Sequence, residues 1–358
     1  MKGQAVQRIG VLFSRLSGYM AACLKALKER YDVELLVVRH APAREAPFEA
    51  RHFDWIGALY DRDGMSETDL SAVVEAFDPD VLLIAGWVDP AYLQVARSLR
   101  KRGRTVVAGS DGQWNGSLRQ RIGQLMAPWY LHTAVDVLWV AGERQRQLAS
   151  RLGFRGEQCW SGYYACDWQR FADVYDPAAT RPQAFLFVGR YVAVKGIDVL
   201  VDAYRRYRDL VDEPWPLLCA GTGEARALLA GQEGILDKGF VQPDVLPALM
   251  REAAAFILPS RREPWGVVVQ EAAASGLPLL CSDACGAAVH LLQDGYNGFL
   301  FEAGNARHLA HCMVNMTNAS PEEWGAMSAR SHQLSKQYTP QRWADTFVRG
   351  VVSYRSDH

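Results

Sequence analysis

Two glutamates and the turn that separates them are the residues best suited to chemistry. Glu263 and Glu271 stand eight positions apart, and Pro264 and Gly266 between them favour a turn over a continuous helix. We therefore expect a small-residue helix that starts at Glu271, with Glu263 on the loop that enters it. Carboxylates accept hydrogen bonds from sugar hydroxyls, and the free N–H groups of a helix N-terminus favour anionic oxygen. This arrangement suits a sugar nucleotide.

The segment around these glutamates resembles a known signature. Residues 262–276, Arg-Glu-Pro-Trp-Gly-Val-Val-Val-Gln-Glu-Ala-Ala-Ala-Ser-Gly, resemble the Glu-x7-Glu motif of the family 4 retaining glycosyltransferases (GT4). Residues 185–198, Phe-Leu-Phe-Val-Gly-Arg-Tyr-Val-Ala-Val-Lys-Gly-Ile-Asp, are similar to that family's diphosphate-binding strand-turn-helix. Residues 294–300, Asp-Gly-Tyr-Asn-Gly-Phe-Leu, resemble the turn before its last strand. The order and spacing of the three segments extend the resemblance over roughly the C-terminal half of the chain.

The resemblance assigns catalytic roles to two cations and the first glutamate. Arg190 and Lys195 would stabilise the negative charge that develops on the leaving diphosphate, and Glu263 would hold hydroxyls of the transferred sugar. The alternative for Arg190 and Lys195 is a pair of surface cations in a loop that enters a helix.

The resemblance assigns nucleotide binding to the second glutamate and to backbone groups. Glu271 would accept hydrogen bonds from both ribose hydroxyls, although a first-turn carboxylate can also simply favour the helix dipole. The N–H groups of Gly266, Val267 and Val268 would bind sugar or phosphate oxygens. Val241 occupies the place of backbone contacts to the nucleobase, and an ordinary apolar residue after a strand would look the same.

The N-terminal half matches by pattern only. The loop that ends at Gly18 stands where relatives carry a glycine-rich loop near the diphosphate. Asp111, beside Ser110, stands where many relatives have a histidine near the donor sugar, and His290 stands where they commonly have a glutamate. Asp111 could bind sugar or orient the acceptor hydroxyl, and it could also cap the following helix.

Short apolar runs followed by helical stretches predict parallel sheets that are buried on both faces. The predicted strands are 9–13, 33–38, 81–85, 105–108 and 135–140, then 185–188, 217–220, 255–258 and 278–281. Right-handed crossovers make such sheets doubly wound. Together with the resemblance, this predicts an α/β protein of the GT-B type, with two Rossmann-like domains facing across a cleft.

The chain of 358 residues suggests two domains. A stretch at 172–182 with two prolines and no periodic apolar face is the expected linker. We expect an acceptor domain at 1–171, a nucleotide-sugar domain at 172–338, and a helix at 339–358. By resemblance that helix packs back on the N-terminal domain.

The composition argues against several other functional classes. The 39 basic and 40 acidic residues give no argument for nucleic acid binding, and the seven cysteines are typical of a reduced, cytoplasmic protein. Asp61 and Asp63 match the Asp-x-Asp metal motif of another glycosyltransferase architecture, but three letters are a weak match. We expect no metal and no cofactor, with the nucleoside diphosphate sugar as co-substrate.

The N-terminus shows no signal-peptide pattern, and no run approaches the roughly 20 apolar residues of a membrane span. Residues 117–132 mix arginines with aromatic and aliphatic side chains. Such a segment can lie on anionic lipid, which would give peripheral contact at the inner membrane surface. It can also bind an acceptor that carries a pyrophosphate. The alternative is a solvated helix face beside a core stripe.

The expected function is transfer of a hexose-type sugar from a nucleoside diphosphate to a hydroxyl, with retention at the anomeric carbon. The acceptor would be a glycan, a lipid-linked molecule or a small molecule. An epimerase or a glycan phosphorylase on the same fold, and a non-catalytic subunit that binds sugar nucleotides, stay open. The sequence does not identify the base, the sugar or the acceptor.

Overall fold

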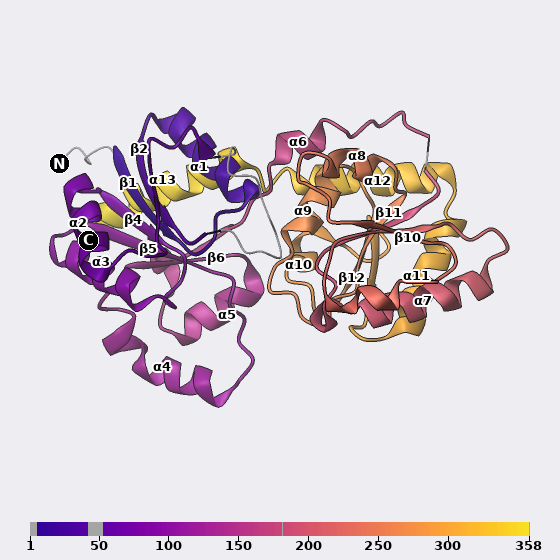
Figure 1. The fold of residues 1–358 in the computed structure, drawn as a ribbon, viewed down its shortest axis with the longest axis horizontal. Coiled ribbons are helices and arrows are strands. Elements are labelled where there is room, and N and C mark those ends of the chain that lie inside the picture. The colour runs from indigo at the N-terminus through magenta and orange to yellow at the C-terminus, as the bar shows by residue number, and fades with distance from the viewer. Residues whose placement is uncertain (1–5, 42–52, 181, 358) are drawn as a thin grey trace. The chain divides into compact units, whose positions relative to one another are not determined.

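The computed structural model describes residues 6–41, 53–180 and 182–357, which form two compact units. The first unit comprises Met1–Ala165 and Pro340–His358, and the second comprises Cys166–Thr339. Each unit is built on one parallel sheet with helices packed around it (Figure 1).

The sheet of the first unit has seven strands in the order β3-β2-β1-β4-β5-β6-β7. Chain order reverses between β1 and β4, and ligands of doubly wound sheets collect beyond the carboxyl ends of strands at such a point. The strands are β1 (Arg8–Phe13), β2 (Glu34–Arg39), β3 (Ala58–Asp61), β4 (Val81–Ile84), β5 (Thr105–Ser110), β6 (Val137–Val140) and β7 (Cys159–Ser161). The helices are α1 (Gly18–Tyr31), α2 (Glu67–Phe77), α3 (Pro90–Lys101), α4 (Leu118–Tyr130), α5 (Glu143–Arg151) and α13 (Pro340–Asp357), with a 3₁₀ turn η2 at Gly156–Gln158.

Both faces of this sheet are buried because successive residues of a strand point to opposite sides. Ile9 and Val11 of β1 lie in one core with side chains of α1 and α13. Leu12 lies in the other core, with side chains of α2 and α3. The uninterrupted apolar runs read from the sequence are the result of this double burial.

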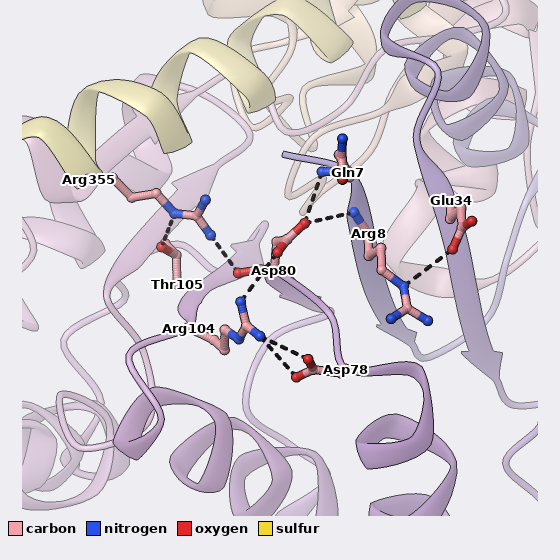
Figure 2. Close-up of polar contacts among 8 residues, drawn as sticks. All are labelled: Gln7, Arg8, Glu34, Asp78, Asp80, Arg104, Thr105 and Arg355. Carbon is pink, nitrogen blue, oxygen red and sulfur yellow. Dashed lines mark hydrogen bonds and ion pairs between the residues drawn. The ribbon is translucent and has the colours of Figure 1, made fainter. Parts of the chain in front are cut away.

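Helix α13 completes the first unit although it follows the second in sequence. Its Trp343 donates from Nε1 to the Tyr163 carbonyl at 2.7 Å, and its ring lies 4.7 Å from that of Trp139. Near its other end Arg355 donates to Thr105 Oγ1 at 3.0 Å and to the Asp80 carbonyl at 2.6 Å (Figure 2).

Asp80 joins these contacts to the start of β1. Its Oδ2 accepts the backbone N–H groups of Gln7 and Arg8 at 2.9 and 3.0 Å, and Arg104 donates to its Oδ1 at 3.3 Å. The amino ends of the central strands and α13 therefore share one polar network (Figure 2).

The sheet of the second unit has six strands in the order β10-β9-β8-β11-β12-β13. They are β8 (Phe185–Val188), β9 (Leu217–Ala220), β10 (Ile235–Gly239), β11 (Ala255–Leu258), β12 (Leu279–Ser282) and β13 (Gly298–Phe301). The α-helices are α6 (Trp168–Ala172), α7 (Ile197–Leu210), α8 (Leu246–Arg251), α9 (Val267–Ala274), α10 (Ala288–Leu291), α11 (Ala306–Asn318) and α12 (Pro321–Ser335). Two 3₁₀ turns are η3 (Ala193–Lys195) and η4 (Glu224–Leu228).

The predicted α/β class with two Rossmann-like halves is confirmed by the two parallel sheets. The division of the chain falls at Ala165/Cys166 and not at 171/172. The reason is that α6 packs on the second unit, where Trp168 Nε1 donates to Ser335 Oγ at 2.8 Å. The segment expected to be a linker also packs there, since Tyr175 stacks on His332 with ring centroids 4.1 Å apart.

The interpretation that the apolar side chains of residues 117–132 form a stripe buried in the core is wrong. Of the side chains on α4 only Ala127 is buried, and the large apolar ones are exposed. Among the described residues, no helix combines the length and the hydrophobicity needed to cross a bilayer.

Candidate functional site

A glycine allows two loops at the carboxyl edge of the second sheet to lie in direct contact. Gly196 begins α7 with φ at +72°, and a Cβ placed there would come within 2.2 Å of the Pro259 carbonyl oxygen. Only glycine permits both the left-handed backbone and this approach. The loop after β8, which carries Lys195, therefore lies directly against the loop after β11, which leads to Glu263.

Polar contacts fix the same two loops. The Arg261 N–H donates to the Val194 carbonyl at 2.9 Å, and its guanidinium forms a two-point contact with Asp198 of α7 at 2.5 and 2.6 Å. Such forked contacts hold both partners in one orientation. They lower the pKa of Asp198 through hydrogen bonds from Arg261.

Lys195 and Glu263 meet as an ion pair across these loops. Their side chains are 17% and 8% exposed, and Ser260 Oγ also donates to Glu263 Oε2 at 3.3 Å. The Glu263 carbonyl accepts the Gly286 N–H at 3.0 Å, which ties the loop to the segment after β12. A shielded cation and a shielded carboxylate are thus held side by side, 68 residues apart in sequence.

Helix α9 begins beside this pair. Its N-cap is Gly266, with φ at +95°, and a Cβ there would lie 3.1 Å from Glu263 Cγ. The N–H groups of Gly266, Val267 and Val268 make no hydrogen bond with the described residues, as expected at a helix N-terminus. They form a ready donor set for an anionic or hydroxyl oxygen.

Glu271 lies beyond the first turn of α9, because this helix begins at Val267 and not at Glu271 as expected, and its side chain is partly buried. The interpretation of Glu271 as a first-turn carboxylate is therefore wrong. Desolvation raises the pKa of its carboxyl to about 7, the negative charge of Asp167 adds to the rise, and Arg170 opposes it. No described residue forms a hydrogen bond or ion pair with the Glu271 carboxyl. Its acceptor oxygens are therefore available to a ligand.

Arg190 and Val241 come from loops after β8 and β10, two strands that β9 separates in the sheet. Arg190 is exposed, and its guanidinium has no hydrogen bond or ion pair with the described residues. Val241 is half-buried two residues beyond β10. The structure places both at the edge that carries Lys195, without a direct contact to it.

In the first unit, Gly18 is the first residue of α1, and a Cβ there would meet no atom within 4 Å. Asp111 follows β5 and is exposed, and its Oδ2 accepts a hydrogen bond from the Tyr164 hydroxyl at 3.3 Å. The N-cap interpretation of Asp111 is wrong, because Ser117 caps the next helix and accepts the Gln120 N–H at 3.4 Å.

His290 lies on α10 within an aromatic group. Its ring centroid is 5.5 Å from that of Trp265 and 6.2 Å from that of Tyr338. A bulky ring packs here beside the residue that precedes Gly266.

Asp61 and Asp63 have separate partners. Asp61 lies 3.8 Å from Arg39, whereas Asp63 contacts His40 Nδ1 and the Ala41 N–H, each at 2.8 Å. In the part of the chain that the structure describes, no three His, Cys, Asp or Glu side chains are grouped to hold a metal ion.

Sequence reasoning missed three polar residues of these sites, namely Ser260, Arg261 and Tyr164. Each forms a hydrogen bond with a predicted site residue or with the loop that carries one. None of them stands at a spacing from the predicted residues that would form a recognisable motif. The adjacency of Ser260 and Arg261 to Glu263 is the one signal that could have identified the first two.

Comparison with known proteins places a family domain in the second unit. Residues 182–318 match the model of the family described as Glycosyl transferases group 1. This range includes Arg190, Lys195, Glu263 and Glu271.

Curated relatives align over similar stretches. The chain is 34% identical over 135 residues to a phosphatidyl-myo-inositol mannosyltransferase of Mycobacterium leprae, covering 36% of this chain and 36% of that protein. It is 36% identical over 189 residues to a D-inositol 3-phosphate glycosyltransferase of Salinispora tropica, covering 48% of this chain and 39% of that protein. It is 34% identical over 120 residues to an uncharacterized glycosyltransferase of Methanocaldococcus jannaschii, covering 32% and 30%. Each alignment spans less than half of the relative's own length.

Solved structures match over nearly the whole chain. HepE of Anabaena in complex with UDP superposes with a TM-score of 0.76 at 17% identity, covering 97% of this chain and 100% of that one. Sucrose-phosphate synthase of Thermosynechococcus elongatus superposes with a TM-score of 0.71 at 15% identity, covering 98% and 100%. These neighbours have the GT-B fold, and the fold of this chain is the same.

Proposed function

We propose that this protein is a GT4-type retaining glycosyltransferase that moves a sugar from a nucleoside diphosphate to an acceptor hydroxyl. The proposal rests on the Lys195–Glu263 ion pair, which lies beside the N–H groups at the N-terminus of α9 that make no hydrogen bond with the described residues. These residues fall within the segment that matches the glycosyltransferase group 1 family. A cation, a carboxylate and backbone donors are the groups that a sugar diphosphate needs.

The proposed roles follow from charge. Lys195 and Arg190 neutralise the charge that builds on the leaving diphosphate, which lowers the barrier most because the groups are already in place. The α9 N–H groups bind phosphate or sugar oxygens, and Glu263 accepts sugar hydroxyls. In the GT4 family the departing phosphate takes the proton of the acceptor on the same face of the sugar, and we extend that step to this protein.

Donor and acceptor recognition are assigned to the remaining residues. Glu271 receives the two ribose hydroxyls, Val241 provides backbone contact to the base, and Gly18 allows the diphosphate to approach α1. Asp111, oriented by Tyr164, receives the acceptor hydroxyl. Because Lys195 and Arg190 are proposed to supply the positive charge at the leaving diphosphate, the reaction is proposed to run without a metal.

The first test is a thermal-shift screen against UDP, GDP, TDP and ADP, since one structural neighbour was solved with UDP. A ligand that binds only the folded protein stabilises it by roughly 2.7 kcal/mol at a hundredfold excess over its dissociation constant. A shift selective for one nucleotide is expected, and no shift with any of them would contradict the proposal.

Turnover of the matching donor then separates the alternatives. A glycosyltransferase needs an acceptor and gives a product of the same anomeric configuration, which NMR reads directly. Interconversion of the donor sugar without acceptor would indicate an epimerase. Binding without turnover in the presence of candidate acceptors would indicate a non-catalytic subunit.

A further inference from the structure

Helix α4 carries a continuous apolar face that its own unit leaves uncovered. This α4 apolar face consists of five side chains that are 51–74% exposed: Leu118, Ile122, Leu125, Met126 and Trp129. Their spacing places them on one side of the helix, because residues three or four apart are neighbours on its surface. In Figure 1, α4 lies at the periphery of the first unit.

The helix is attached to its unit through the opposite side. Ala127 is its buried residue, and Gln120 donates to the Gln113 carbonyl at 2.6 Å and accepts the Asn115 N–H at 2.7 Å. Surface helices ordinarily bury their apolar stripe and expose their polar one. On α4 this orientation is reversed, so the apolar face is presented outward.

The segment that carries this face has charged side chains of a single sign. Residues 112–135 contain no Asp or Glu, whereas Arg119 and Arg121 flank the α4 apolar face on either side. At the C-terminal end Arg97 donates to the Tyr130 carbonyl at 3.0 Å, and its guanidinium lies 5.4 Å from the centre of the Tyr130 ring. Three arginines thus surround an apolar strip that ends in Trp129 and Tyr130.

We propose that α4 docks this protein on an anionic lipid surface. The α4 apolar face enters the boundary between headgroups and acyl chains, and Arg119 and Arg121 reach the headgroup phosphates. Aliphatic and tryptophan side chains on one face, with arginines along its border, are what such interfacial helices require. Trp129 and Tyr130 have the amphipathic rings that favour this depth.

A second copy of the chain fits this face less well. A symmetric pair would bring α4 against α4 with its arginines and no acidic residue of the helix to meet them. A phosphate-rich membrane supplies the missing negative charge, and it also covers a long flat strip without needing a shaped groove.

The test is sedimentation of the full chain with vesicles of phosphatidylcholine alone and of phosphatidylcholine with 30% phosphatidylglycerol as probe. Wild-type protein should sediment with the anionic vesicles and much less with the neutral ones, and 1 M NaCl should release it because the Debye length falls to about 3 Å. The variant Leu125→Gln/Trp129→Gln should bind at least about tenfold more weakly. Arg119→Gln/Arg121→Gln should lose about fivefold for each arginine.

A control variant changes exposed apolar residues on two other helices. Leu210→Gln/Val352→Gln removes side chains that are 55% and 45% exposed, and it should bind vesicles as the wild type does. All the substitutions are at exposed sites, so circular dichroism and the thermal midpoint should not change. Equal binding by Leu125→Gln/Trp129→Gln and wild type would overturn the proposal. So would a wild-type dimer in light scattering that this variant dissolves, because the occupant would then be a second copy.

Discussion

At the scale of single residues, Lys195 is the most informative position. Lys195→Ala should lower turnover of the bound donor by roughly two to three orders of magnitude, because a preorganised charge opposite the leaving phosphate is lost. Steady-state kinetics with saturating donor measures this. Lys238→Ala, which removes an exposed lysine of the same unit, is the matched control.

The same substitution also leaves Glu263 buried without its cation, which costs stability. The double variant Lys195→Ala/Glu263→Gln also removes the negative charge of Glu263 and should recover thermal stability while activity stays low. Activity near wild type in Lys195→Ala would show that the lysine serves only as the partner of Glu263.

Glu271 gives a prediction about pH. Its pKa is raised to about 7 by desolvation, so the folded protein favours the protonated carboxyl and loses stability as pH rises from about 4.5 towards 7. The ionised form is the better acceptor for two ribose hydroxyls. The preference for a ribonucleotide over its 2′-deoxy analogue should therefore grow as pH rises from 6 to 8.

Calorimetric titration with UDP and 2′-deoxy-UDP checks this, and the ratio of affinities cancels titration of the phosphates themselves. Glu271→Gln should flatten the pH dependence and weaken ribonucleotide binding by about 1.5–3 kcal/mol. Glu252→Gln, at an exposed glutamate of the same unit, is the control. A wild-type ratio that is constant from pH 6 to 8 would remove Glu271 from ribose binding.

At the scale of elements, the contact between the loops after β8 and β11 decides the geometry of the site. Gly196→Ala should lower the free energy of unfolding by roughly 1–3 kcal/mol, because it adds a clash with the Pro259 carbonyl to backbone strain. Gly231→Ala is a close control, since Gly231 has φ at +70° but open space around it. Urea denaturation should show the larger loss at Gly196, and equal losses would mean that the close approach is unimportant.

The elements were also where prediction from sequence worked best. Strands β1, β4, β8 and β11 were predicted because burial on both faces makes them unbroken apolar runs. Strand β3 was missed although residues 58–60 are apolar, because the strand is short and its side chains are half-buried or exposed.

The candidate site was predictable where residues act through a local pattern. The turn before α9 follows from Pro264 and Gly266, although the helix begins at Val267 and not at Glu271. The pairing of Lys195 with Glu263 depends on a backbone approach between distant loops. Burial of polar partners such as Ser260 likewise arises only when β8 and β11 come together. The spacing of residues along the sequence does not predict such contacts.

At the scale of the whole molecule, the absence of metal dependence is a further expectation. Chelation with EDTA should leave transfer unchanged, since cations of the protein are proposed to neutralise the diphosphate. Asp63→Asn should likewise leave activity intact, because Asp63 contacts His40 and the Ala41 N–H and is assigned no role. Loss of activity on chelation with recovery on added Mn²⁺ or Mg²⁺ would return attention to Asp61 and Asp63.

The placement of α13 has a consequence for how the protein is made. Trp343 and Arg355 hold α13 to strands and loops that leave the ribosome long before it does. At about 5–20 residues per second, synthesis of the intervening second unit takes on the order of ten seconds or more. During that interval the surface around Trp139 and Tyr163 has no cover. The nascent first half is therefore a natural client for chaperones, and the second unit can finish folding before the first.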